Sequence, residues 1–245
     1  MKEFLKNMHI VLVEPKNAGN IGSTVRAMKN MGISNLRLVN PVEYRDVDEQ
    51  KKMGYRSQEI IQASKVFKDL KSALEDINLV FLATSKKGKW KKDFLSPDSA
   101  SKIIKQHIKK EKIAFVFGRE DSGVTIDEAQ LANYFVKIPS AVSYPSLNLS
   151  QAVMVVVYEI YKEITSSREL KSIPRMAKKE SFLRLADNIW SLMKELKMKE
   201  EENGLFHRSL KRALNRTFWT NADIAVFDRF CKQVRWYIEN KVDEE

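Results

Sequence analysis

Short apolar runs alternate with helix-like segments along the first two thirds of this chain, and this alternation restricts the possible folds more than any other feature. The runs are His9–Val13, Leu36–Val39, Leu79–Ala83, Ile113–Phe117 and Tyr134–Ile138. The helix-like segments between them lie at about Ile21–Met31, Gln58–Leu70, Pro97–Lys110 and Thr125–Ala132. Several runs are apolar throughout, which is typical of strands covered on both faces. The pattern predicts an α/β domain with a mostly parallel sheet between two layers of helices.

After the last run, the segment Ile138–Tyr161 leads through a proline-stiffened loop into an apolar helix. No polar stripe interrupts Ala152–Tyr158, which predicts a helix buried on most sides. Ser146 and Asn148 stand where this helix begins, and its first backbone N–H groups have no partner within the helix. These two side chains either cap the helix or face a ligand together with its positive end.

The character of the chain changes at Thr165–Lys179, a polar and basic stretch with one proline. Beyond it, apolar residues recur at helical spacing in two stripes. The stripes are Phe182, Leu185, Ala186, Ile189, Met193, Leu196 and then Ile224, Phe227, Cys231, Val234, Ile238. Neither is long enough to favour a coiled coil with a partner. We therefore predict an α/β domain at residues 1–164, a linker at 165–179 and a small all-α extension at 180–245.

The composition indicates a globular protein with a polyanionic partner. The 245 residues are 43% hydrophobic and 31% charged, with a net charge of +11 and a pI near 9.5. The positive charges cluster in two places, around Trp90 and along a short stretch of the predicted extension. The first cluster is Lys86, Lys87, Lys89, Lys91 and Lys92, and the second is Arg208, Lys211, Arg212 and Arg216.

Other site classes are disfavoured. One cysteine, Cys231, and three widely separated histidines give no metal-ligand spacing, so no metal is expected. No apolar run is long enough to span a membrane and no signal sequence is evident, which predicts a cytoplasmic protein. Gly19 and Gly22 suggest a glycine turn, but neither a G-x-G-x-x-G nor a phosphate-loop pattern is present, so a coenzyme such as NAD is the less favoured alternative.

Four unusual segments follow predicted strands. They are Glu14–Arg26, Thr84–Lys89, Gly118–Gly123 and the proline-rich loop before Asn148. The carboxyl ends of parallel strands meet at one edge of a sheet, where ligands bind, so we expect these segments to form a single site. Arg119 and Glu120 bring a guanidinium and a carboxylate to this edge, with a structural ion pair as the alternative interpretation.

Three of these segments together resemble the SpoU/TrmH branch of the SPOUT RNA 2′-O-methyltransferases. The motifs are N-x-G-N-x-G-x-x-x-R at Asn17–Arg26, G-R-E-x-x-G at Gly118–Gly123 and I-P…S-L-N-x-S-x-A at Ile138–Ala152. Within this branch, YPSLNLSQAV and the tail LKRALNRTFWTNADIAVFDRF resemble a subgroup that methylates tRNA at position 32 of the anticodon loop. The resemblance covers most of Met8–Lys162.

The resemblance implies a trefoil knot in the C-terminal part of the α/β domain, which general rules of chain topology disfavour. It also implies a homodimer, S-adenosyl-L-methionine as cofactor and tRNA as partner. Carried over by motif, the catalytic residues are Asn20, Arg26, Glu120, Ser146 and Asn148. The cofactor-binding residues are Ala83, Thr84, Ser85, Gly118, Ile138, Pro145, Ser146 and Leu147.

The implied reaction transfers a methyl group in line from a sulfonium to a ribose 2′-oxygen. Because a guanidinium does not lose its proton in proteins, we expect Arg26 to bind a phosphate and stabilise developing oxyanion charge, while phosphate or water takes the proton. Two alternatives remain open. One is the same chemistry on ribosomal RNA, and the other is an RNA-binding module without turnover.

Overall fold

The computed structural model describes residues 4–85, 94–141, 147–166, 175–198, 204–215 and 219–241. The chain divides into two compact units, Met1–Ile173 and Pro174–Glu245. Of the sequence features singled out above, the lysine cluster around Trp90, the side chains of Pro145 and Ser146, and Arg216 lie outside the described residues.

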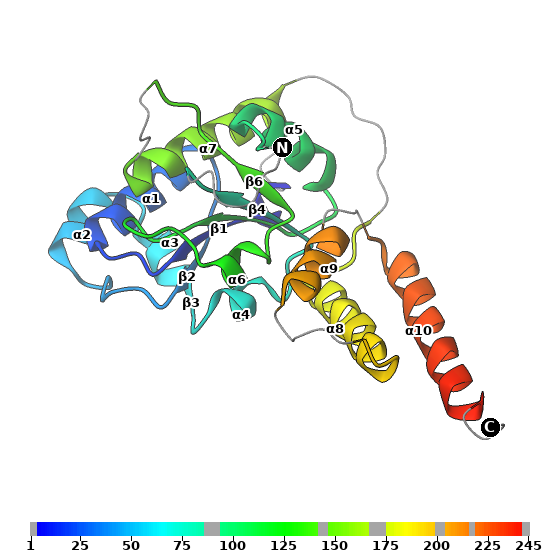
Figure 1. Ribbon diagram of the computed structural model, residues 1–245. Coiled ribbons are helices and arrows are strands. Elements are labelled where there is room, and N and C mark those ends of the chain that lie inside the picture. Colours follow the sequence, from blue (N-terminus) through cyan, green and yellow to red (C-terminus); the bar gives the residue numbers. More distant parts are fainter. Residues whose placement is uncertain are drawn as a thin grey trace. The chain divides into compact units, whose positions relative to one another are not determined.

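The first unit is built on a six-stranded sheet in which every pairing is parallel (Figure 1). The strands follow the order β3-β2-β1-β5-β4-β6. Their bounds are β1 Met8–Val13, β2 Asn35–Val39, β3 Lys65–Phe67, β4 Leu79–Ala83, β5 Ile113–Phe117 and β6 Tyr134–Val136. The predicted α/β class and the five predicted strands are confirmed. The helix predicted over Gln58–Leu70 is wrong beyond Ala63, because Lys65–Phe67 form the edge strand β3. These three residues are partly or fully exposed and form no apolar run that would have indicated a strand.

Helices cover both faces of this sheet, with α1, α5 and α7 on one side and α4 and α6 on the other (Figure 1). Two short helices, α2 and α3, lie in the connection between β2 and β3, and a 3₁₀ turn, Phe4–Asn7, precedes β1. The bounds are α1 Ala18–Asn30, α2 Asp48–Met53, α3 Gln58–Ala63, α4 Leu70–Leu74, α5 Pro97–His107, α6 Ile126–Ala129 and α7 Leu149–Thr165.

The central strands are buried along their whole length, which explains their continuous apolar sequences. All residues of β1 and β5 are buried. On one face, the ring of Phe115 stacks on those of Phe81 and Phe117, with centroids 5.8 and 5.2 Å apart. The opposite face packs Val11 and Val116 against α4 and α6. The core therefore sits on both faces of the sheet and leaves the strand ends for polar loops.

Gly19 and Gly22 lie inside helix α1, so the expectation of a glycine turn is wrong. A Cβ on Gly22 would lie 2.6 Å from the backbone oxygen of Gln50 in α2, and one on Gly19 would lie 2.6 Å from the Glu49 carboxylate. The two glycines let α1 and α2 pack closely, and no ligand is needed to explain them.

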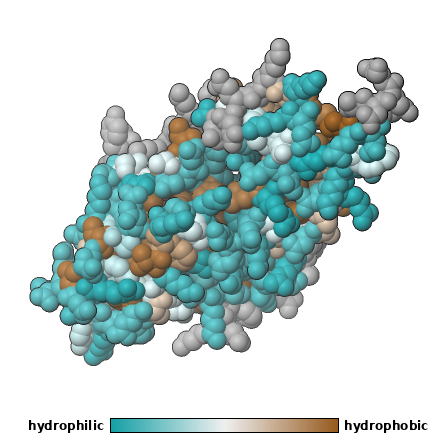
Figure 2. All heavy atoms as spheres, turned by 90° about the horizontal axis from the view of Figure 1, so that it is seen from below, coloured by the Kyte–Doolittle hydropathy of each residue, from teal (hydrophilic) through white to brown (hydrophobic). Residues whose placement is uncertain are grey.

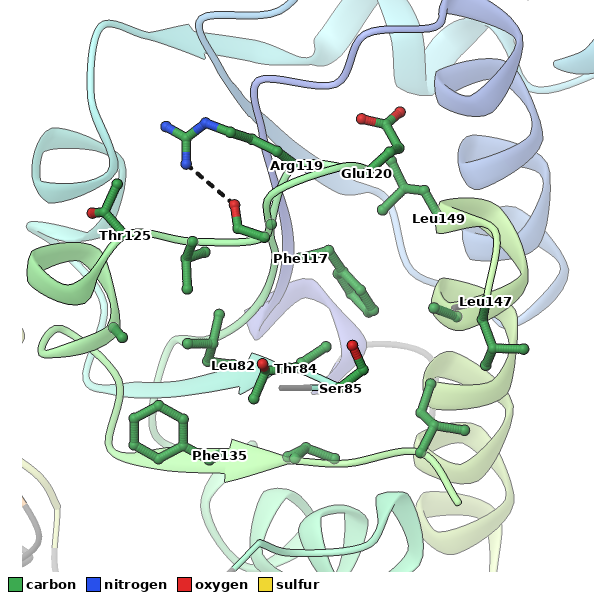
Figure 3. A pocket seen from close by; sticks show the side chains of 18 of the residues that line it. Leu82, Thr84, Ser85, Phe117, Arg119, Glu120, Thr125, Phe135, Leu147 and Leu149 are labelled. Atoms are coloured by element: carbon green, nitrogen blue, oxygen red, sulfur yellow. Dashed lines mark hydrogen bonds between the residues drawn. The ribbon is translucent and has the colours of Figure 1, made fainter. Parts of the chain in front are cut away.

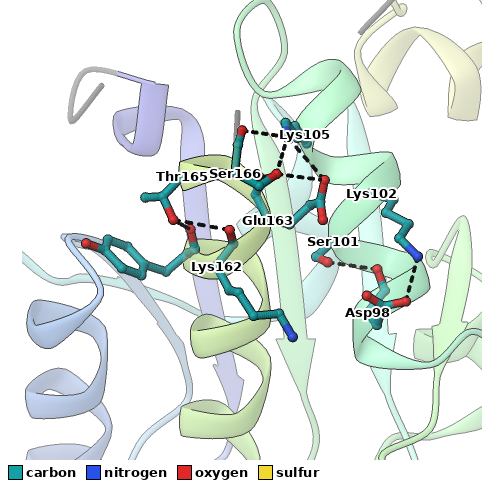
Figure 4. A network of polar contacts seen from close by, with 9 residues as sticks. Asp98, Ser101, Lys102, Lys105, Lys162, Glu163, Thr165 and Ser166 are labelled. Carbon is teal, nitrogen blue, oxygen red and sulfur yellow. Dashed lines mark hydrogen bonds and ion pairs between the residues drawn. The ribbon is translucent and has the colours of Figure 1, made fainter. Parts of the chain in front are cut away.

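Helix α7 is buried on one side only, so the expectation of burial on most sides is wrong for the single chain. Val153, Val156 and Val157 are buried, whereas Val155 and Tyr158 are 37% and 49% exposed. At its C-terminal end, Lys105 of α5 donates from Nζ to Glu163 Oε1 at 3.2 Å and to the carbonyl of Ser166 at 3.1 Å (Figure 4). These contacts join the last turn of α7 to α5.

The second unit contains helices α8, Lys179–Glu195, α9, Leu205–Asn215, and α10, Asn221–Lys241. Ala177, Leu185 and Ile224 form a small core, against which Ile189 and Trp219 pack. Among the described residues, no helix combines the length and the low polarity needed to cross a bilayer. Hydrophilic side chains cover most of one face of the molecule, with hydrophobic side chains in separate patches (Figure 2).

Candidate active site

A cavity of about 370 Å³ opens at the carboxyl ends of β4, β5 and β6 and at the start of α7 (Figure 3). Its apolar side is formed by residues such as Leu82, Phe117 and Phe135, and its polar side by Thr84, Ser85 and the loop after β5. Residues from three of the four segments expected to form one site, those after β4, β5 and β6, line this cavity, whereas no residue of Glu14–Arg26 does. A cavity of this size and lining suits a small organic molecule.

Six of the eight residues proposed to bind the cofactor line this cavity. They are Ala83, Thr84, Ser85, Gly118, Ile138 and Leu147. The other two, Pro145 and Ser146, lie outside the described residues. The sequence motifs did not point to the apolar side of the cavity, since its residues are indistinguishable from core residues until the sheet is assembled.

The loop Gly118–Gly123 is closed at its base. Arg119 and Gly123 exchange two backbone hydrogen bonds of 3.0 Å. A Cβ on Gly118 would lie 2.5 Å from the backbone carbon of Gly123, and Gly123 has φ +76°. Both glycines are needed for this close approach and left-handed backbone. The loop therefore presents Glu120, Asp121 and Ser122 at its tip.

Three predicted catalytic residues from three motifs are joined by hydrogen bonds. Asn148 donates from Nδ2 to Asn20 Oδ1 at 3.0 Å, and Asn20 donates from Nδ2 to Glu120 Oε1 at 3.3 Å. The cap interpretation of Asn148 also holds, because its Oδ1 accepts from the backbone N–H of Ser150 at 2.9 Å. A carboxylate only accepts hydrogen bonds, so Glu120 determines which way the amide of Asn20 faces, and Asn20 in turn orients Asn148.

Lys16 also contacts the tip of this loop, and the sequence motifs did not single it out. Its backbone N–H donates to Glu120 Oε2 at 3.3 Å, and its ammonium pairs with Asp121. The hydrogen bond from Lys16 lowers the pKa of Asp121 to about 2. Asp121 therefore stays ionised across the neutral range, and its charge is balanced by the ammonium of Lys16.

Arg119 does not pair with its neighbour Glu120, contrary to the ion pair considered from sequence. Its side chain turns away from Glu120 (Figure 3) and binds Glu14, which follows β1, and Glu128 of α6. The hydrogen bond from Arg119 lowers the pKa of Glu14. Burial alone would raise the pKa of Glu128, but hydrogen bonds from Arg119 and Thr125 outweigh it, and the pKa falls. All three groups therefore remain charged at neutral pH.

Arg26 is not among the residues that line the cavity. It is exposed on α1, and it forms no hydrogen bond or ion pair with the part of the chain that the structure describes. Asn20 stands six residues, or about 1.7 turns, earlier on the same helix. The single chain thus assembles three of the five predicted catalytic residues and leaves Arg26 on the surface of α1.

No group of three or more His, Cys, Asp or Glu side chains with metal-binding geometry occurs within the described ranges. In the second unit, Lys211 of α9 pairs with Asp187 at 3.5 Å, and Arg212 donates to Ser209 at 3.0 Å. Part of the predicted basic cluster is thus engaged within its own unit.

Known proteins share both the sequence and the fold of this chain. The model of the SpoU rRNA Methylase family matches residues 7–158. TrmJ of Sodalis glossinidius (strain morsitans), a tRNA (cytidine/uridine-2′-O-)-methyltransferase, is 38% identical over 156 residues, which are 64% of this chain and 61% of that protein. TrmJ of Yersinia enterocolitica is 34% identical over 185 residues, 76% of this chain and 71% of that protein.

The crystal structure of TrmJ from Z. mobilis ZM4 has a TM-score of 0.78 at 24% identity and covers 93% of this chain and 98% of that one. At this identity the likeness shows the fold. The family match covers more than half of the chain and includes all of the hydrogen-bonded line from Asn148 to Glu120. This chain therefore belongs to the SpoU methylase family.

Proposed function

We propose that this protein is an S-adenosyl-L-methionine-dependent methyltransferase that modifies the 2′-hydroxyl of a tRNA ribose, at position 32 of the anticodon loop. The observation that carries the proposal is the line Asn148–Asn20–Glu120 beside a cavity at the carboxyl edge of the sheet. The tRNA substrate is supported by the relatives from Sodalis and Yersinia, and position 32 by the motif resemblance. Such an enzyme works in the cytoplasm.

The residues around the cavity fit the cofactor. Leu82, Phe117 and Phe135 provide apolar surface for a purine, and Thr84 and Ser85 bring hydroxyls to the same cavity. S-adenosyl-L-methionine, when bound, supplies an electrophilic methyl group on a sulfonium. Pro145 and Ser146 complete the proposed cradle, as the motif resemblance implies.

The chain's own groups orient the acceptor. Each of Asn20 and Asn148 has one Nδ2 hydrogen in the line described above and a second available to hold the ribose. Correct alignment of donor and acceptor lowers the barrier by several kcal/mol, on the order of what intramolecular reactions gain. Arg26 binds the neighbouring phosphate and stabilises charge that develops on the 2′-oxygen, and phosphate or water takes the proton.

A homodimer completes this proposal. The exposed side of α7 carries three large hydrophobic residues, Val155, Tyr158 and Tyr161, which are between 37% and 49% exposed. Apolar helix faces of this kind mark interfaces. Helix α1, which carries Arg26, packs against α7. Val155→Arg is expected to yield monomers in light scattering, and an unchanged mass would contradict the dimer.

A trefoil knot also belongs to the proposal. β6 forms one edge of the sheet, and the next described element of the chain, α7, packs against both α5 and α1. Threading the chain through a loop is rare in proteins. The proposal is supported by the hydrogen bond between Asn148, which precedes α7, and Asn20, which are 128 residues apart in sequence.

The helical extension, residues 180–245 after a linker at 165–179, grips the tRNA body. Arg208 of α9 supplies phosphate-binding charge. We expect a chain that ends after Ser166 to keep cofactor binding and lose tRNA methylation. Unchanged methylation by the shortened chain would refute this role.

The central test combines calorimetric titration of S-adenosyl-L-methionine with a methyl-incorporation assay on total tRNA and total rRNA. We expect cofactor binding and labelled tRNA, with the label at the 2′-oxygen of nucleotide 32. If only rRNA were labelled, the substrate would be rRNA and not tRNA. Cofactor binding without label would indicate an RNA-binding protein, and binding of NAD instead would overturn the proposal.

A further inference from the structure

The loop after β5 carries two neighbouring charged side chains that point in different directions. Glu120 accepts from Asn20 at 3.3 Å, while Arg119 turns to the other side of the loop (Figure 3). The loop is closed by backbone hydrogen bonds between Arg119 and Gly123. Because the two residues share a peptide bond in this narrow loop, the position of Arg119 also sets the position of Glu120.

Every N–H of the Arg119 guanidinium is used within the chain. Nε and Nη2 donate to the Glu14 carboxylate at 2.9 and 2.5 Å. Nη1 and Nη2 donate to the Glu128 carboxylate at 2.9 and 3.0 Å, and Nη1 also reaches the Gly123 carbonyl at 3.2 Å. These bonds account for the five N–H groups of an arginine, and the side chain is only 15% exposed. Arg119 has no donor left for RNA or cofactor.

The two carboxylates belong to the elements that frame the site. Glu14 follows β1 directly, with a strained φ of +44°, and leads to the start of α1 where Asn20 lies. Glu128 closes a capping box with Thr125 on α6, next to the cavity wall. One guanidinium therefore fixes the β1–α1 loop, the β5–α6 loop and α6 relative to one another.

We propose that Arg119 is a positioning residue for methyl transfer, which acts by holding Glu120 where it orients Asn20 and Asn148. This inference rests on the proposed function. A lysine cannot replace Arg119, because three donors on one nitrogen do not match two carboxylates and a carbonyl at once. A positive charge alone is therefore not enough to hold Glu120 in place, and the planar guanidinium with its several N–H donors is required.

The test compares Arg119→Lys with Arg37→Lys as a matched control. Arg37 is also a buried arginine, and its Nη1 and Nη2 donate to the Asp76 carboxylate at 2.6 and 3.1 Å. Asp76 precedes β4 and therefore lies at the opposite end of this strand from the cavity. We expect Arg119→Lys to lower kcat at saturating cofactor and RNA by at least about tenfold, as small misplacements do. Arg37→Lys is expected to lower stability and leave kcat unchanged.

A double-mutant cycle with Glu120→Gln separates positioning from general weakening of the fold. If Arg119 acts through Glu120, Arg119→Lys lowers kcat by less than about twofold in the Glu120→Gln background. Full activity of Arg119→Lys, or an equal loss in both backgrounds, would overturn the proposal. Glu128→Gln keeps the shape of the Glu128 side chain but removes its charge, and it is expected to lower kcat less than Arg119→Lys does. This variant replaces Arg119→Lys in the test if Arg119→Lys folds poorly.

A readout without turnover distinguishes this proposal from the proposed function. The side-chain amide NMR signals of Asn20 and Asn148 are expected to shift in Arg119→Lys and to stay unchanged in Arg37→Lys. If the wild-type chain methylates no RNA, the proposed function fails. The amide signals still report whether Arg119 determines the orientation of the Asn20 and Asn148 side chains. Unchanged amide signals in Arg119→Lys would overturn the positioning role.

Discussion

His9 makes the first unit sensitive to mild acid. The side chain is 8% exposed on β1, and its Nδ1 accepts a hydrogen bond from Arg37 Nε at 3.2 Å. Burial, together with the positive charge of Arg37, lowers the pKa of His9 from 6.5 to about 3. Protonation would place a second cation against the guanidinium and remove its acceptor. The folded state therefore keeps His9 neutral, whereas the unfolded chain takes up a proton below pH 6.5.

The sign and size of the effect follow from this difference in proton uptake. The folded-state pKa is depressed, so the stabilisation is fully present above pH 6.5 and is lost as the pH falls towards 3. Each pH unit in this window costs about 1.4 kcal/mol, so the free energy of unfolding falls by roughly 2 to 3 kcal/mol between pH 6.5 and 4.5. That loss is a large fraction of the stability of an ordinary domain.

The assay is urea unfolding followed by far-UV circular dichroism between pH 8 and pH 4.5. His9→Gln keeps an acceptor for Arg37 but does not titrate. We expect it to be less stable than the wild type at pH 8 and to lose less stability on acidification, so that the two curves converge. His107, whose pKa burial also lowers, titrates in both proteins and cancels in the comparison. Parallel curves across the whole pH range would refute the reasoning.

Three further predictions concern separate parts of the chain. Gly22→Ala places a Cβ 2.6 Å from the Gln50 carbonyl, and we expect a loss of about 1–3 kcal/mol in urea unfolding. Burial lowers the pKa of Lys179 to about 7, so the charged side chain destabilises the second unit fully below pH 7 and less and less as the pH rises towards 10. Lys179→Met should therefore stabilise this unit more at pH 7 than at pH 10, as measured by unfolding followed by tryptophan fluorescence. Arg26→Lys keeps the charge but loses the fork, so methylation should fall at least about tenfold with cofactor affinity unchanged, and full activity would contradict the role of Arg26.

The elements that were predictable are those whose pattern is local. Leu79–Ala83 and Ile113–Phe117 are strands with the predicted bounds, because residues buried on both faces must be apolar at every position. Lys65–Phe67 was missed, since an exposed edge strand places no such demand on its sequence. Gly19 and Gly22 were misread as a turn because their requirement comes from α2, which packs on α1 from another part of the chain.

The candidate site shows the same division. Asn20, Glu120 and Asn148 were recognised individually through their motifs, and their convergence was expected from the rule that parallel strands share a carboxyl edge. The hydrogen bonds that join Asn148, Asn20 and Glu120 were not predictable, because they connect side chains that are 100 and 128 residues apart in sequence. Arg119 was placed at the correct edge, and a structural ion pair was considered for it, but its partners Glu14 and Glu128 were not predictable.

The amino-acid order by itself determined the parallel α/β architecture, the family motifs and the edge at which they meet, since each depends on local periodicity or on a short contiguous pattern. Only the tertiary structure decided that Arg119 binds Glu14 and Glu128, that α7 keeps an apolar face exposed, and that Arg26 lies apart from the cavity. These features depend on the distances between segments that are remote in sequence, and such distances exist only once the sheet and its helices have packed.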